Sequence, residues 1–292
     1  MDRKKFLKQA LIGGVAGAMI PAAVKAGNFR LKNSDYDQMM KQVGFNHLPN
    51  NEDKTLNTIL HKADTRGHAN HGWLDSHHTF SFANYYNPER MHFGVLRVLN
   101  DDIVDEGKGF ATHPHDNMEI ISIPLEGDLE HKDSMGNVAV IRQGDVQVMS
   151  AGTGIYHSEY NKNNDRKVKF LQIWIFPNKK EVTPRYDQVS LQDLQKKNEF
   201  YQVLSPNPGD QGVWIHQDAW FHLGNFDEGN TAVYKIKKPG NGVYAFIIEG
   251  DAEINGQQLN KRDGFGIWDI SALSFKSITK SKVLLMEVPM AV

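Results

Sequence analysis

Short runs that alternate apolar and polar residues, separated by glycine-containing turns, recur over most of this chain. Successive side chains of a β-strand point to opposite faces of its sheet, so such runs predict strands that bury one face. Residues 92–99, 120–125 and 231–236 are examples, and turns such as Gln143-Gly144-Asp145 lie between runs of this kind. Strands at this short and regular spacing favour a sandwich or a barrel. The sequence therefore predicts an all-β fold.

The strand pattern occurs twice, which predicts two β domains. Glu126-Gly127-Asp128 and Glu249-Gly250-Asp251 are each flanked by predicted strands. A weak internal repeat of this kind indicates two similar antiparallel β-barrels in tandem. Between them, residues 178–198 are charged and polar and include Pro184, as expected of a connection that contains one short helix.

The N-terminus resembles an export signal. Basic residues crowd the first eight positions, residues 10–24 are small and apolar, and Val24-Lys25-Ala26 resembles a cleavage site. The apolar run of about 15 residues is shorter than the roughly 20 that a membrane-spanning helix needs. Residues 3–8 resemble a twin-arginine signal with lysine in place of the second arginine, and a general secretory signal is the alternative. We predict a periplasmic protein that contacts the membrane only through this signal; if the signal is not used, the protein stays cytoplasmic.

These patterns divide the chain into four segments. Residues 1–26 form the export signal, and residues 27–70 form a polar extension with one or two short helices and loops. We predict that residues 71–180 form an N-terminal β domain and that residues 181–292 form a C-terminal domain that is a degenerate copy of it.

Charge and cysteine content exclude several classes of function. The formal net charge is −2; residues 1–26 hold five of the 33 basic and one of the 35 acidic residues, so the remainder carries −6. No basic surface is expected, which argues against a nucleic-acid partner. The chain has no cysteine, which excludes disulfides, thiolate zinc sites and cysteine nucleophiles. We expect a monomer whose partners are small molecules.

Two short motifs predict a metal site. His113-Pro114-His115 and His157-Ser158-Glu159 each place two ligand groups at positions i and i+2. Alternate residues of a strand share a face, so each motif aims two side chains into one space. Three imidazoles and a carboxylate suit a first-row divalent ion and leave positions open for substrate. The second half has no paired histidines at matching places, so we expect metal in the first barrel only.

Other residues compete for a role in this site. Glu119 shares a strand face with His115, and strand parity does not decide between Glu119 and Glu159 as the carboxylate ligand. A second cluster formed by the histidines of residues 68–78 is an alternative to a structural role for them. The residues that we expect to be structural or part of the core are His68, His71, His77, His78, His92, His131, His216, His222, Phe80, Phe82 and Trp174. For Phe80, Phe82 and Trp174, a surface on which the substrate stacks is the alternative.

The motifs carry a family resemblance. The pattern G-x5-H-x-H-x3-E that begins at Gly107, followed by the glycines and histidine of residues 144–161, resembles the cupin superfamily, with one extra residue between Glu119 and Gly127. Residues 112–119, 149–159 and 73–82 are similar to the pirin family. This resemblance runs from about residue 70 to the C-terminus, and the export signal and the 27–70 extension depart from it.

The resemblance implies a fold, a cofactor and an activity. It implies a bicupin, that is, two tandem jelly-roll barrels, with iron(II) held by His113, His115, His157 and Glu159. Copper, nickel, manganese or zinc could take the same site. The nearest members implied are quercetin 2,3-dioxygenases, which use O2 to open the ring of a flavonol or another enolisable phenol, with Glu159 as the catalytic base. The alternatives are a metal-dependent sensor or interaction protein like nuclear pirin, and a cupin enzyme with a different substrate.

Overall fold

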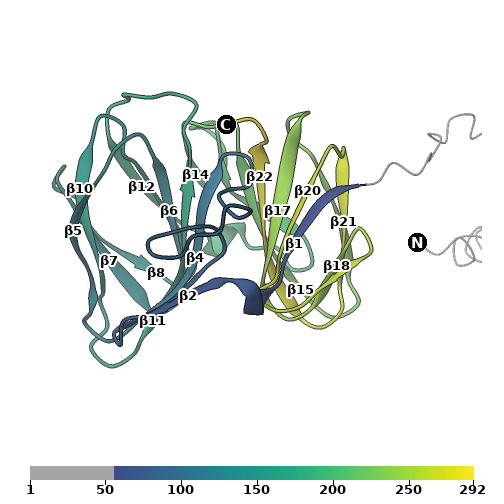
Figure 1. Cartoon of the computed structure of the whole chain (residues 1–292), viewed down its shortest axis with the longest axis horizontal. Coiled ribbons are helices and arrows are strands. Elements are labelled where there is room, and N and C mark those ends of the chain that lie inside the picture. The colour runs from purple at the N-terminus through teal and green to yellow at the C-terminus, as the bar shows by residue number, and fades with distance from the viewer. Residues whose placement is uncertain (1–55) are drawn as a thin grey trace, which may run out of the picture. The chain divides into compact units, whose positions relative to one another are not determined.

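Four β-sheets make up residues 56–292, the part of the chain that this computed structural model describes (Figure 1). The seven-stranded sheet of the N-terminal half has the order β12 (Arg185–Ser190), β9 (Asp145–Ser150), β6 (Glu119–Glu126), β11 (Val168–Ile175), β4 (Leu96–Val104), β3 (Leu74–His78) and β2 (Gly67–Asn70). The four-stranded sheet that faces it has the order β5 (Gly109–His115), β10 (Ile155–Asn161), β7 (Asp128–Asp133) and β8 (Val138–Arg142).

The C-terminal half repeats this plan. Its seven-stranded sheet has the order β1 (Asn57–His61), β20 (Gly264–Trp268), β17 (Asn241–Glu249), β22 (Ser281–Pro289), β15 (Trp220–Phe226), β13 (Phe200–Ser205) and β14 (Val213–Trp214). Its four-stranded sheet has the order β16 (Thr231–Lys235), β21 (Ala272–Ser277), β18 (Ala252–Ile254) and β19 (Gln257–Leu259). The predicted all-β bicupin is confirmed, although each barrel consists of two facing sheets and is not a closed ring of hydrogen-bonded strands.

The equivalent turns of the two halves show why the repeat is visible in the sequence. Gly127 lies between β6 and β7, Gly250 lies between β17 and β18, and both have positive φ values, of 75° and 72°. A side chain at either position would collide with a backbone carbonyl, that of Lys167 or Lys280. Both turns therefore require glycine for the same two reasons.

The largest core lies between the two seven-stranded sheets and joins the halves. On β11, Leu171 and Ile173 face this central core while Phe170 faces the interior of the N-terminal half. On β17, Tyr244 and Phe246 face it while Val243 and its alternate neighbours face the C-terminal interior. Both strands are buried on both faces, which explains their nearly continuous apolar sequences.

The interiors of the two halves differ in polarity, and this difference favours a ligand site in the N-terminal half. Apolar side chains such as Phe226, Phe265 and Phe275 fill the C-terminal half. The N-terminal half has two smaller apolar clusters, around Phe170 and around Met149, and its other inward positions are polar. Only a half with polar side chains on its inner wall can hold an ion or a polar ligand, because a buried polar group needs a partner.

Two strands cross the predicted segment boundaries. Strand β1, from the segment predicted as a polar extension, pairs with β20 of the C-terminal half, and β12 pairs with β9 of the N-terminal half. Within residues 64–70, predicted as a loop, β2 pairs with β3. The loop prediction was wrong because a strand as short as β2 is stabilised by a partner that no local pattern reveals. The domain boundaries stay predictions.

The helical content is small. Single 3-10 turns, η1 (Ala63–Thr65) and η2 (Gln192–Leu194), are the helices of residues 56–292, and η2 lies where a short helix was predicted. In the described region, no helix has the length and apolar character needed to cross a membrane. The predicted export signal and residues 27–55 lie outside this region.

Candidate metal centre

Three of the predicted ligands meet on neighbouring strands. Strands β5 and β10 are antiparallel, with His113 opposite His157 and His115 opposite Ile155. One ring nitrogen from each histidine lies within 4.8 Å of one from each of the others. The ring centroid of His157 is 4.4 Å from that of His113 and 4.9 Å from that of His115. The structure therefore brings all three imidazoles to one point.

Strand alternation explains which residues face inward. On β10, Ile155, His157, Glu159 and Asn161 are buried while Tyr156 and Tyr160 are exposed. The register with β5 shifts between His157 and Glu159, so that Glu159 lies opposite Phe110. Such a bulge changes the direction of the strand beside it. Glu159 thus keeps the inward direction of His157 but faces a different part of the partner strand.

Hydrogen bonds determine which nitrogen of His113 is free. The Nδ1 atom of His113 lies 2.8 Å from the carbonyl oxygen of Ala111. A carbonyl oxygen only accepts, so Nδ1 carries the hydrogen and Nε2 keeps its lone pair. The Nε2 atom is therefore the one available to a metal ion.

A chain of three side chains orients His157 in the same way. Burial tends to raise the pKa of Asp133, but hydrogen bonds from Asn137 and His131 outweigh it and the pKa lies below its usual value, so Asp133 is an acceptor. His131 Nε2 donates to its Oδ2 atom at 3.1 Å. The Nδ1 atom of His131 then accepts from His157 Nδ1 at 3.4 Å. This leaves His157 Nε2 as a lone-pair nitrogen, buried and without a hydrogen-bond partner among the described residues.

Two of the three histidines, His115 and His157, are held neutral by their surroundings. Burial and the neighbouring histidines lower the pKa of His157 to about 2, and burial with the proximity of His113 lowers that of His115 to about 4. Neutral imidazole is the form that binds a metal ion. The lowered pKa values of His115 and His157, the defined tautomers of His113 and His157, and the unpartnered Nε2 of His157 make this donor set fit a divalent transition metal.

Glu159 lies beside the histidine group but is not a member of it in the structure. Gln172 Nε2 donates to Glu159 Oε2 at 2.7 Å, and Ser122 Oγ lies 3.1 Å from Oε1. The carboxyl is 2% exposed, and burial raises its pKa to about 7 despite these two hydrogen bonds. A buried acid with a pKa near neutrality is suited to accept and release a proton.

The competing carboxylate, Glu119, lies elsewhere. Ser150 Oγ donates to Glu119 Oε2 at 2.7 Å, and the charge of Arg185 acts on the same carboxyl. Burial raises the pKa of Glu119 to about 7, although Ser150 and Arg185 oppose this. Although parity allowed either glutamate, tertiary packing places only Glu159 on the wall of the cavity described next.

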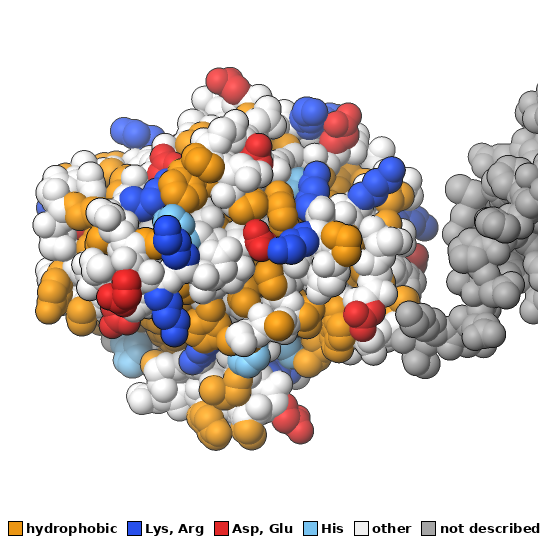
Figure 2. Space-filling model, turned by 90° about the horizontal axis from the view of Figure 1, so that it is seen from above, with side chains coloured by type: hydrophobic (Ala, Val, Ile, Leu, Met, Phe, Trp, Pro, Cys, Tyr) orange, Lys and Arg blue, Asp and Glu red, His pale blue; other side chains and the backbone are white. Residues whose placement is uncertain are grey.

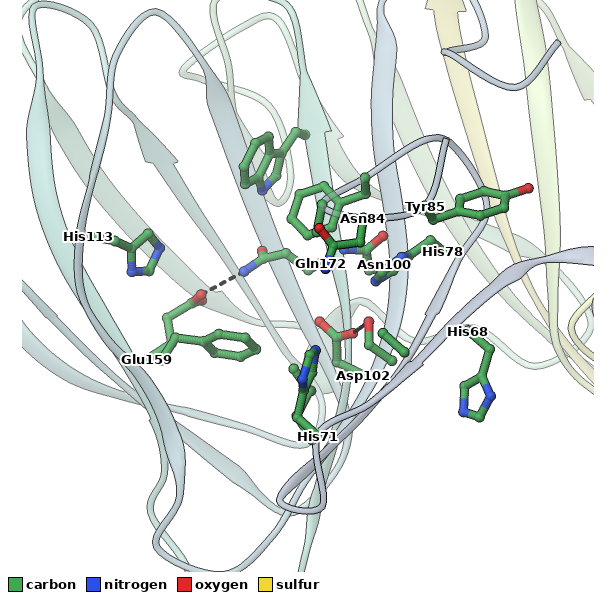
Figure 3. Close-up of a pocket in the computed structure, with 17 residues that line it drawn as sticks. His68, His71, His78, Asn84, Tyr85, Asn100, Asp102, His113, Glu159 and Gln172 are labelled. Atoms are coloured by element: carbon green, nitrogen blue, oxygen red, sulfur yellow. Dashed lines mark hydrogen bonds between the residues drawn. The ribbon is translucent and has the colours of Figure 1, made fainter. Parts of the chain in front are cut away.

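A cavity of about 430 Å³ opens from the histidines toward β2 and β3 (Figure 3). His113 and Glu159 lie on one side of it and His68 lies on the other. Its aromatic wall includes Phe82 and Trp174, whose rings meet edge to face at 5.4 Å. The cavity lies within the range of small-molecule sites.

Several residues around the site have roles other than those predicted from the sequence. Trp174 packs against the apolar cluster around Met149 as predicted, but it also lines the cavity and meets His115 edge to face at 4.9 Å. Phe82 was expected in the core but lines the cavity. Phe80 is a core residue as predicted. His131 was expected to be structural, but it orients His157. Its i, i+2 spacing with Asp133 was the available signal, since this spacing places both side chains on one face of β7.

The surface carries charges of both signs. On the face shown in Figure 2, lysine and arginine side chains are interspersed with aspartate and glutamate, without a continuous basic field.

Comparison with known proteins places the chain in a family. Residues 59–175 match the pirin family model, and residues 202–288 match that of the quercetinase C-terminal cupin domain. A quercetin 2,3-dioxygenase of Escherichia coli (strain K12) is 46% identical over 230 residues, which cover 79% of this chain and 98% of that protein. The chain belongs to the pirin family.

Further relatives include a pirin-like protein of Caulobacter vibrioides, 37% identical over 225 residues, which cover 77% of this chain and 96% of that protein. The crystal structure of YhhW from Escherichia coli matches this chain with a TM-score of 0.76 and 44% sequence identity. The match covers 81% of this chain and 99% of that one. The crystal structure of bacterial pirin YhhW in complex with nickel(II) matches with the same TM-score of 0.76, over 81% of this chain and 100% of that one.

Proposed function

We propose that this pirin is a metal-dependent dioxygenase that opens the ring of quercetin or a related flavonol with O2. The observation that carries the proposal is the convergence of three imidazoles beside a cavity of about 430 Å³, whose wall includes His113. The expectation of an enzyme of the quercetin 2,3-dioxygenase type agrees with the relative that is 46% identical.

His113, His115 and His157 are proposed to hold the ion, which we take to be iron(II). Nickel is an alternative supported by the relative's nickel complex, and copper, manganese and zinc suit the same donor set. When bound, a divalent ion supplies Lewis acidity to a phenolic oxygen and a place for O2 beside it.

Glu159 is proposed as the fourth ligand and as the base that takes the proton of the substrate hydroxyl. Ser122 Oγ lies 3.1 Å from both Glu159 Oε1 and Gln172 Oε1, but it has one hydrogen to donate. With Glu159 ionised, Ser122 donates to Glu159. With Glu159 protonated at Oε1, Glu159 donates to Ser122 and Ser122 donates to Gln172. The network therefore accommodates the proton before and after transfer.

The cavity walls favour a flat aromatic substrate with hydroxyl groups. Phe82 and Trp174 supply ring surfaces. Asn100 Oδ1 and His78 Nδ1 are buried in the wall without a hydrogen-bond partner among residues 56–292, and such groups destabilise a site unless a ligand or water satisfies them. Asp102, whose pKa burial raises to about 7, lies on the same wall. We propose that hydroxyls on the far ring of the substrate meet these atoms.

An oxygen-uptake assay tests the activity. The full chain is freed of metal, loaded anaerobically with iron(II) or nickel(II), and mixed with quercetin in an oxygen electrode. Uptake should be lost in His157→Ala and kept in His222→Ala, a buried histidine of the other half. No uptake with any metal would contradict the proposal and favour the sensor or interaction protein.

A pair of substrates tests the polar wall. Wild type is expected to prefer quercetin over a flavonol without hydroxyls on the far ring by about tenfold in kcat/KM, because unpaired buried polar atoms disfavour the apolar analogue. Asn100→Leu should reduce this preference and retain turnover of the analogue. An unchanged preference in the variant would exclude Asn100 from substrate recognition.

We also propose export to the periplasm as a monomer, with residues 1–26 as the signal. The basic start and short apolar run of this segment support the first point. Fractionation of cells that express the full chain, with a Lys4→Ala/Lys5→Ala variant as control, tests export, and light scattering of the purified protein tests the monomer.

A further inference from the structure

A second group of potential ligands lies on the outer face of β2 and β3. His68 and His77 are directly opposite one another in this antiparallel pair. Burial alternates along β3, with Asp75 and His77 outward and Ser76 and His78 inward. The histidine-rich segment is therefore divided: His78 faces the cavity, and His77 joins His68 and Asp75 on the other face.

The three outward side chains already contact one another. His68 Nε2 lies 2.8 Å and His77 Nδ1 lies 3.7 Å from Asp75 Oδ1. The two imidazole rings are stacked, with centroids 4.5 Å apart and an interplanar angle of 17°. One potential ligand atom from each residue lies within 4.8 Å of those of the other two.

The spacing of these three side chains is close to that of ligands around a bound ion. Zinc lies about 2.0–2.2 Å from nitrogen and oxygen ligands, so ligand atoms on one tetrahedral ion are about 3.3 Å apart. The side chains of His68, Asp75 and His77 are 51%, 39% and 34% exposed, so small rotations can bring them to this spacing. Strand β2 is the edge of its sheet, so water can complete the coordination.

We propose that His68, Asp75 and His77 bind a second divalent ion of the zinc, copper and nickel class. Two imidazoles and a carboxylate suit these ions, and three protein ligands leave positions open to solvent. The nearby Arg66 is ion-paired with Asp101 at 3.4 Å, which reduces its repulsion of a cation. Of the three proposed ligands, His68 also borders the cavity, on the side opposite His113 (Figure 3), whereas Asp75 and His77 are not among the residues that line it.

Counting bound ions tests this proposal without any substrate. Metal-free full chain is titrated with Zn²⁺ by calorimetry and by competition with a coloured chelator. Wild type is expected to bind about two ions per chain and His77→Gln about one. We call the ion held by His113, His115 and His157 the inner ion and the ion held by His68, Asp75 and His77 the outer ion. His157→Gln should lose the inner ion and keep the outer one. Asp75→Asn should lower the affinity for the outer ion about tenfold or more. The control is His92→Gln, an exposed histidine outside both groups, which should bind two.

A stability measurement separates lost ligation from lost folding. Without metal, His77→Gln should unfold at the wild-type temperature, because His77 is partly exposed beside an edge strand. With excess Zn²⁺, wild type should gain more stability than His77→Gln, since binding to the native state stabilises it. A single ion on wild type, or an unchanged zinc stoichiometry in His77→Gln, overturns the proposal. Either result leaves the dioxygenase proposal standing, because the inner ion is counted separately.

Discussion

Replacing His131 by phenylalanine is expected to weaken metal binding and leave the fold in place. Phenylalanine is similar in size and keeps an aromatic ring against Tyr186, whose centroid lies 4.7 Å from that of His131. It removes the acceptor for His157 Nδ1 at 3.4 Å. The proton of His157 can then move to Nε2, which blocks the nitrogen that would bind the ion. Loss of such an orienting partner costs about 10–100-fold in metal affinity, or about 1.4–2.7 kcal/mol.

Competition with a chelator measures this affinity for the ion held by the three histidines. The matched control is His222→Phe, because His222 is also buried and lies against a tyrosine, with its ring centroid 4.9 Å from that of Tyr234. Both variants should melt at similar temperatures, and only His131→Phe should bind metal more weakly. Equal affinities of His131→Phe and wild type, or an equal loss in His222→Phe, would refute the proposed role of His131.

Three other changes have defined outcomes. Glu159→Gln should retain most of the metal and lower kcat at least about 100-fold in the oxygen electrode, because an amide cannot accept the substrate proton; wild-type turnover would exclude Glu159 as the base. The pKa of Asp102 is raised by burial from 3.8 to about 7, so the native state binds more protons than the unfolded state across that window. The free energy of unfolding of the metal-free protein should therefore fall as pH rises from about 4 to about 7, and urea titrations should show a smaller fall for Asp102→Asn; an unchanged slope would contradict the raised pKa. Leu171→Ala in the central core should cost about 2–5 kcal/mol of unfolding free energy, against roughly 0.5 or less for Val138→Ala, which is 66% exposed.

The elements that the sequence predicted correctly are those governed by local geometry. Alternation with a period of two is a property of the strand backbone, so the inward directions of His157 and Glu159 follow from their spacing alone. The glycine turns at Gly127 and Gly250 are equally local, because positive φ restricts the residue type wherever it occurs. The two tandem β domains follow from these repeated short patterns, and the family resemblance implied that they are cupins.

The remaining features depend on segments that are distant in the sequence. The separation of Glu119 from the histidines, the hydrogen bonds that hold Glu159 to Ser122 and Gln172, and the contact of His131 with His157 all arise where strands meet across the sheets.

By itself, then, the sequence determined the strands that carry a clear alternating pattern and which side chains of each such strand share a face. Tertiary structure alone decided that β1 joins the C-terminal half, that Trp174 lines a cavity, and that His68 and His77 meet on an outer face. The physical reason is that the direction of a side chain is a local property of the backbone, whereas its neighbours depend on strand pairing and packing over the whole fold.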